Sequence, residues 1–195
     1  MNLKWNWFGL AGGALSLAIV AISFIFPWWH LVVGENLVTV NVSPVATAFN
    51  LFGTSLAIPL LVALNLTGLL ALATAGAAMV IYSVIPKKPY ARHILDFGYR
   101  KPLYSVVFFV ITLFVLTLLV KSFVDISIPL YGTSTLTLPK NLSQGATITA
   151  QMNTGFLWPF WTEIAAAALC IGARFYHKKI IALPKTPADP SLMKP

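Results

Sequence analysis

A single acidic residue, Glu163, lies inside the apolar stretch from Gly155 to Lys179. The stretch is typical of a membrane-spanning helix, and the helical rise places Glu163 about 10 Å below its outer end. An ionisable group at that depth indicates a functional site, because a charge is costly in hydrocarbon. Lys121 could reach inward and pair with the carboxylate. With Asn65 and Thr67 of another apolar run, these residues form a possible intramembrane polar site.

Three uses of Glu163 are open. It can be a structural carboxylate that stays neutral or accepts hydrogen bonds from Thr162, Asn65 or Thr67 and locks helix packing, and this is the interpretation we adopt. It can serve a small transporter or ion-conducting protein with Asn65 and Thr67 as polar lining, although a relay normally needs further ionisable steps. It can also act with His30 in a quinone- or cofactor-associated subunit of a membrane enzyme complex.

Motifs of known catalytic or cofactor centres are absent from the sequence. No Cys or His spacing suits zinc, and no histidines lie within apolar runs that could face each other across a haem. Walker, Rossmann and nucleophile-elbow patterns are missing. The chain has one cysteine, Cys170, which excludes an internal disulfide. We therefore expect no catalytic residues, no cofactor, no metal and no enzymatic activity.

The composition indicates a membrane protein. The chain of 195 residues is 58% hydrophobic and 9% charged, whereas roughly 25% of an ordinary soluble domain is charged. A domain of this size cannot bury so much apolar surface and still present a polar exterior. About twenty apolar residues cross a bilayer. We therefore predict an all-α transmembrane four-helix bundle, with its spans at residues 8–26, 56–85, 103–122 and 155–176.

The basic residues predict the orientation. All 13 Lys and Arg residues except Lys121 and Lys140 lie before the first span, between the second and third, or at the end of the fourth and beyond it. The positive-inside rule places residues 1–7, the loop 86–102 and a disordered tail 177–195 in the cytoplasm. We predict a multi-pass plasma membrane protein with both termini cytoplasmic. Nucleic acid is not expected as a partner, because the cations are dispersed and no binding module is recognisable.

The two outside segments, residues 27–55 and 123–154, carry strand-like patterns. Residues 37–42 alternate in β-branched side chains, and the Thr-rich second segment repeats this pattern. We expect both segments to form one small extracellular antiparallel β cap. Asn41 and Asn141 begin glycosylation sequons in these segments and are possible glycosylation sites.

Small residues recur in the predicted helices and indicate close helix packing, as in other membrane helices. The expected packing positions are Gly9, Gly12, Gly13, Ser16, Gly68 and Gly76.

The stretch "PWWHLVVGENLVTV", residues 27–40, resembles the opening of the first extracellular segment of the claudin and peripheral-myelin-protein superfamily. The resemblance implies four helices, cytoplasmic termini and a sheet built from both external loops. It also implies lateral and face-to-face assembly or service as an accessory subunit. The Gly-Leu-Trp motif and paired cysteines of that superfamily are absent here.

Together these patterns lead to a functional expectation. We interpret the chain as a non-enzymatic structural or accessory subunit of a larger membrane assembly. Its expected partners are the lipid bilayer and either other membrane protein subunits or further copies of itself.

Overall fold

The structure is a computed structural model that describes residues 5–34, 38–45, 47–51, 54–56, 59–137 and 149–181. Its helices and strands alternate in groups along the chain. In order they are α1 (Trp7–Ile22), β1 (Trp29–Val33), β2 (Val38–Val42), β3 (Thr47–Leu51), β4 (Thr54–Leu56), α2 (Pro59–Val84), α3 (Ala91–Gly98), α4 (Lys101–Val124), β5 (Gly132–Thr137), β6 (Thr149–Phe156) and α5 (Trp158–Ile181).

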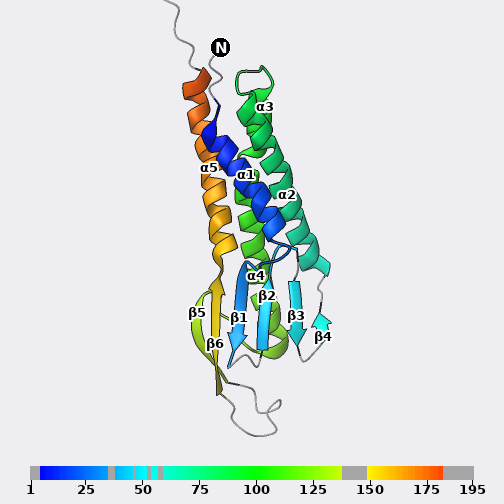
Figure 1. Cartoon of the computed structure of the whole chain (residues 1–195). Coiled ribbons are helices and arrows are strands. Elements are labelled where there is room, and N and C mark those ends of the chain that lie inside the picture. Colours follow the sequence, from blue (N-terminus) through cyan, green and yellow to red (C-terminus); the bar gives the residue numbers. More distant parts are fainter. Residues whose placement is uncertain are drawn as a thin grey trace, which may run out of the picture.

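Four long helices lie side by side and form one half of the elongated molecule (Figure 1). Helix α1 packs against α2 and α5, and α4 also packs against α2 and α5. Each of α1 and α5 buries residues spaced three or four apart, which places them on one helix face. In α1 the buried residues are Gly9, Gly12, Gly13, Ser16 and Ile19. In α5 they include Phe160, Glu163, Ala167, Cys170 and Ala173.

A six-stranded antiparallel sheet forms the other half, with the strand order β4-β3-β2-β1-β6-β5. Strands β1 to β4 come from the segment between α1 and α2, and β5 and β6 from the segment between α4 and α5. The central strand β1 pairs Leu31 with Val40 of β2 and with Thr154 of β6. Its side chains alternate between buried and half-buried, so one face of the sheet contributes to the core.

Aromatic side chains join the sheet to the helices. Trp28 is fully buried, and its ring centre lies 5.0 Å from that of Phe109 in α4 and 6.3 Å from that of Phe160 in α5. The Trp28 indole N–H donates to the Ser23 hydroxyl over 2.9 Å, and this hydroxyl donates to the Ile19 carbonyl over 2.6 Å. Helix α1 ends at Ile22, and the bond from Trp28 to Ser23 ties the following segment back to the end of the helix.

The predicted all-α four-span bundle is wrong in two respects. The sheet is a major part of the fold. Of the helices in the described ranges, only two, Leu61–Val84 and Ala91–Phe123, are long and apolar enough to cross a membrane. Helix α1 has 16 residues because it ends early, and the apolar residues after Ile22 lie outside it. Helix α5 carries Glu163 and Arg174 within its length, which lowers its apolar character.

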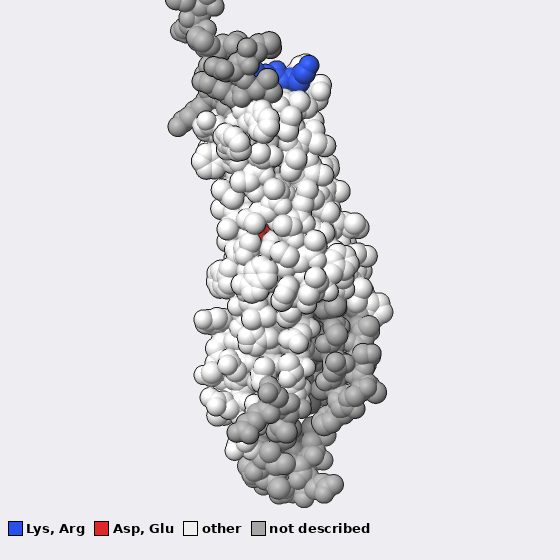
Figure 2. All heavy atoms as spheres, viewed as in Figure 1, with Lys and Arg blue, Asp and Glu red and all other residues white. Residues whose placement is uncertain are grey.

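The helix α3 lies at the end of the bundle far from the sheet, in the segment that we predicted as a loop (Figure 1). Ala91, Leu95 and Gly98 form its buried face. The start of α1 and the end of α5 lie at the same end of the bundle as α3. The visible Lys and Arg side chains gather at this end, whereas the helical face below them is almost uncharged (Figure 2). We call this end of the molecule the basic end.

Candidate functional site

Glu163 is fully buried in the first half of α5, on the helix face that packs against the rest of the bundle. Neither of its carboxylate oxygens has a hydrogen-bond partner among the described residues. A charged carboxylate without a partner is expensive in an apolar interior, whereas a protonated one costs much less. The surroundings of Glu163 therefore favour the neutral acid.

The expected partners of Glu163 bond elsewhere. The Thr67 hydroxyl donates to the Ala63 carbonyl over 2.8 Å, and the Thr162 hydroxyl donates to the Trp158 carbonyl over 2.8 Å. The Asn65 amide donates to the Ser43 carbonyl over 3.5 Å. Lys121 is exposed in the last turn of α4. Within the described part of the chain, no hydrogen bond or ion pair joins Glu163 to any of these residues.

The small residues of α1 lie where neighbouring backbones come closest. A Cβ atom on Gly12 would lie 2.8 Å from the Cys170 sulfur, and one on Gly13 would lie 2.8 Å from the Gly76 carbonyl oxygen. A Cβ atom on Gly9 would lie 2.5 Å from the Ser83 hydroxyl. Gly68 has more room, since its nearest neighbour, Cβ of Phe108, would be 3.6 Å away. Helices α1, α2 and α5 therefore pack with almost no space between them.

Of the two sequon asparagines, Asn41 is exposed on β2, opposite Ala48 of β3. Asn141 lies outside the described residues. His30 is half-buried on β1, and its ring packs 3.5 Å from the position of a Cβ on Gly155.

A buried polar network that we did not predict ties three helices together at the basic end. The side chains of Asn6, Tyr82 and His177 are almost completely buried. The Asn6 amide nitrogen donates to the Tyr82 hydroxyl over 2.9 Å and to the Ala173 carbonyl over 3.0 Å, and the Asn6 side-chain oxygen accepts from the Gly9 N–H. The Tyr82 hydroxyl lies 2.7 Å from Nδ1 of His177.

These contacts assign the proton positions. The Asn6 amide nitrogen can only donate, so the Tyr82 oxygen accepts that bond and its single proton points to His177. His177 Nδ1 is then the acceptor, and the ring proton is on Nε2. Burial lowers the pKa of the His177 imidazole, and the nearby Arg174 guanidinium lowers it further. The network therefore holds a neutral histidine, because a proton on Nδ1 would break its hydrogen-bond order.

An ion pair borders this network. Arg174 of α5 lies 3.0 Å from the Asp96 carboxylate of α3, and Arg92 lies 3.8 Å from the same carboxylate one helical turn away. The pair fixes α3 against α5. Such a partly exposed pair contributes little to stability by itself, but it orients the Arg174 side chain.

Glu163 and the network of Asn6, Tyr82 and His177 offer only limited chemistry. In the described ranges, no three His, Cys, Asp or Glu side chains come together as a metal site. The Tyr82 hydroxyl is fully buried between Asn6 and His177, so it is not presented to a substrate. The network can stabilise helix packing and respond to acid, and Glu163 can exchange a proton where one reaches it.

Comparisons with known proteins do not identify a family. No protein family model matches the chain, and no curated protein matches it. The resemblance to the claudin and peripheral-myelin-protein superfamily therefore depends on residues 27–40 and the expected topology alone.

Proposed function

We propose that the protein is a multi-pass protein of the plasma membrane that serves as a non-enzymatic structural or accessory subunit of a larger membrane assembly. The two helices that are long and apolar enough to cross a membrane would provide the spans. With these two spans, the segment between α2 and α4, which contains α3, faces the cytoplasm and the sheet faces outward.

The observation that carries the proposal is the distribution of side chains on α2 and α4. Both helices bury small or weakly polar residues, including Ala75, Ser83, Ser105 and Thr112. Each helix also buries large apolar residues, such as Leu72 and Met79 in α2 and Phe109 and Leu113 in α4. Other large apolar residues are exposed along both helices, and they include Val62, Leu66, Leu70, Ile81, Leu103, Val107, Ile111, Phe114 and Leu118. Exposed apolar patches of this extent are typical of surfaces that contact lipid or another protein.

A packed interior favours a structural role over a conducting one. The glycines of α1 bring its backbone into contact with α2 and α5, and a Cβ on Gly13 or Gly76 would lie within 3.0 Å of the other's carbonyl oxygen. Glu163 also has no hydrogen-bonded or ion-paired partner in the described part of the bundle. A passage for ions would need space and further polar steps along these contacts.

Cysteine labelling tests the orientation, because the chain has a single cysteine that is buried and can be replaced in a Cys170→Ala background. Thr135→Cys on β5 and Lys88→Cys at the basic end are both at exposed positions. We expect an impermeant maleimide to label Thr135→Cys in intact cells and Lys88→Cys only after permeabilisation. Labelling in the reverse order, or loss of the protein from membranes in alkaline carbonate, contradicts the proposal.

Assembly is tested separately. After cross-linking in the native membrane and mild detergent extraction, we expect a species larger than the monomer on native electrophoresis. Recovery of the monomer alone under these conditions contradicts the accessory role.

A second candidate function, a proton or ion pathway through Glu163, is favoured by its two unpartnered carboxylate oxygens. Purified protein in liposomes would then dissipate an imposed proton or ion gradient, and Glu163→Gln would abolish the flux because the amide cannot exchange a proton. Asp96→Asn, at the exposed ion pair, is the control for loss of an acidic residue. Equal flux in wild type, Glu163→Gln and protein-free liposomes excludes this function.

A further inference from the structure

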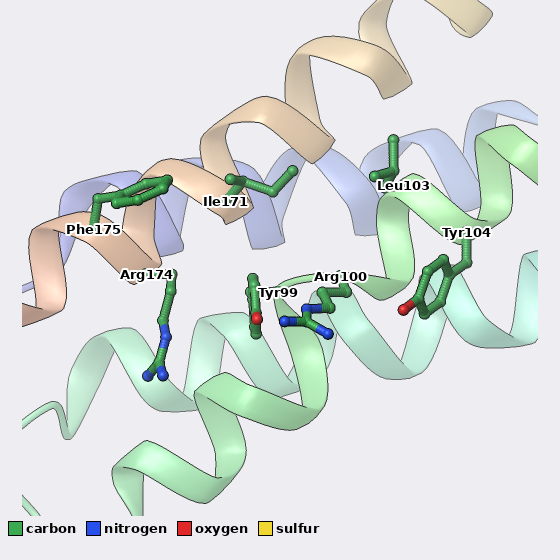
Figure 3. Close-up of a pocket in the computed structure, with 7 residues that line it drawn as sticks. All are labelled: Tyr99, Arg100, Leu103, Tyr104, Ile171, Arg174 and Phe175. Atoms are coloured by element: carbon green, nitrogen blue, oxygen red, sulfur yellow. The ribbon is translucent and has the colours of Figure 1, made fainter.

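A groove of about 580 Å³ opens at the basic end, between α5 and the junction of α3 with α4. Figure 3 shows the side chains that line it. Its polar members are Tyr99, Arg100, Tyr104 and Arg174, and its apolar members include Leu103 and Phe175. The volume is within the range of small-molecule sites in proteins.

Two guanidinium groups dominate the polar part of the groove. The Arg100 and Arg174 guanidinium carbons lie 5.0 and 5.7 Å from the centre of the Tyr99 ring. Tyr99 lies between these two side chains, and the Tyr104 hydroxyl points toward Arg100 (Figure 3). The tyrosines thus orient two cations along one wall. Planar guanidinium groups held in this way suit the oxygens of a phosphate.

Among the described residues, Asp96 is the only acidic residue near these two arginines, and its ion pair leaves other N–H donors of Arg174 free. Asp96 pairs with Nη1 of Arg174, and a guanidinium has further N–H groups beyond that bond. Arg100 stands directly before α4, which begins at Lys101 beside the groove.

Apolar residues form the rest of the groove. Leu103 is 42% exposed and Phe175 is 71% exposed. From Leu103 the outward apolar residues of α4 continue away from the basic end through Val107 and Ile111. A ligand with an anionic head and a long apolar tail matches both parts of the surface at once.

We propose that this groove binds the phosphate of an anionic phospholipid, with Arg100 and Arg174 holding the phosphate oxygens and an acyl chain lying along Leu103 and the outward face of α4. This inference rests on the proposed membrane location. The phosphate lies at the cytoplasmic headgroup level, where anionic lipids and basic pockets between helices meet. The site would fix the depth of the basic end in the bilayer.

The test measures the thermal stability of detergent-purified full-length protein, in neutral detergent, as phosphatidylglycerol is added. We expect the wild type to be stabilised in a saturable manner and phosphatidylcholine to have a much smaller effect. Arg100→Gln should weaken the apparent affinity for phosphatidylglycerol about tenfold, since a charge-assisted contact is lost. Arg174→Lys keeps a cation for Asp96 but lacks the planar fork, so it should also weaken the affinity.

Lys88→Gln is the matched control, because Lys88 is exposed at the basic end but does not line the groove. It should bind phosphatidylglycerol as the wild type does. Equal weakening by Lys88→Gln, equal stabilisation by phosphatidylcholine, or equal stabilisation by inorganic phosphate overturns the lipid site. If the wild type shows no lipid response yet resists carbonate extraction, the groove assignment fails while the membrane proposal stands. Release by carbonate would instead contradict the membrane proposal.

Discussion

At the residue scale, the hydrogen bonds of Asn6 fix the order of a whole network. This residue caps α1 and also reaches the last turn of α2 and the second half of α5. Its position directly before an apolar run is a signal that the sequence offers, because Asn is a preferred N-cap residue. Its partners are not predictable in this way. Tyr82 is 76 positions from Asn6 along the chain, and His177 is 95 positions from Tyr82. Only the folded bundle brings the three residues together.

We predict that the protein loses stability in acid because of His177, the histidine of this network. Its pKa is lowered from the ordinary value of 6.5, so the unfolded chain binds a proton more readily than the folded one as the pH falls through 6.5. The free energy of unfolding therefore decreases in that window and is unaffected well above it. We expect His177→Gln, which keeps an acceptor for Tyr82, to flatten the decline in melting temperature between pH 7 and pH 5.

His93→Gln is the control, because His93 is exposed on α3. It should retain the wild-type pH profile. A His177→Gln profile that matches the wild type would show that the network does not sense acid.

At the element scale, sequence patterns predict some boundaries and miss others for identifiable reasons. The alternation in residues 37–42 predicts a strand, and β2 occupies Val38–Val42. The apolar run of the first helix continues to Phe26, but α1 ends at Ile22 and the chain folds back so that Trp28 bonds to Ser23. Helix α3 was missed because its buried face is only Ala91, Leu95 and Gly98 within a basic segment. Tertiary contacts thus override the local pattern at both places.

Helix α1 depends on its glycines, which gives a prediction for the element. In Gly12→Ala the new Cβ would lie 2.8 Å from the Cys170 sulfur and 2.9 Å from its backbone nitrogen. The backbones of α1 and α5 must then move apart, at a cost of about 1–3 kcal/mol. We expect a clear drop in melting temperature, measured by size-exclusion chromatography of heated, detergent-solubilised protein.

Gly68→Ala is the matched control. Its Cβ would meet nothing closer than 3.6 Å, and alanine favours a helix interior over glycine. The control should be neutral or slightly stabilising. Equal behaviour of the two variants would mean that α1 does not pack as closely as the structure indicates.

At the scale of the whole molecule, composition predicts an apolar exterior. It does not predict how many helices are long and apolar enough to cross a membrane. Four apolar runs of sufficient length suggest four spans, whereas two described helices meet the requirement. The predicted polar site is also incomplete, because Glu163 has no bonded partner while Thr67 and Asn65 bond to backbone carbonyls. Residue type indicated Glu163, but its isolation is a property of the packed bundle.

The short connection between β6 and α5 has a mechanical consequence. Only Leu157 separates Phe156 from Trp158, and its N–H is bonded to the Trp28 carbonyl over 2.9 Å. Because the connection is one residue long and hydrogen-bonded, we expect β6 and α5 to rotate together. Helix α5 is about 36 Å long, so a rotation of about 5° at the strand sweeps its far end through about 3 Å. A displacement of the sheet would thus move Arg174 and His177 at the opposite end of the bundle.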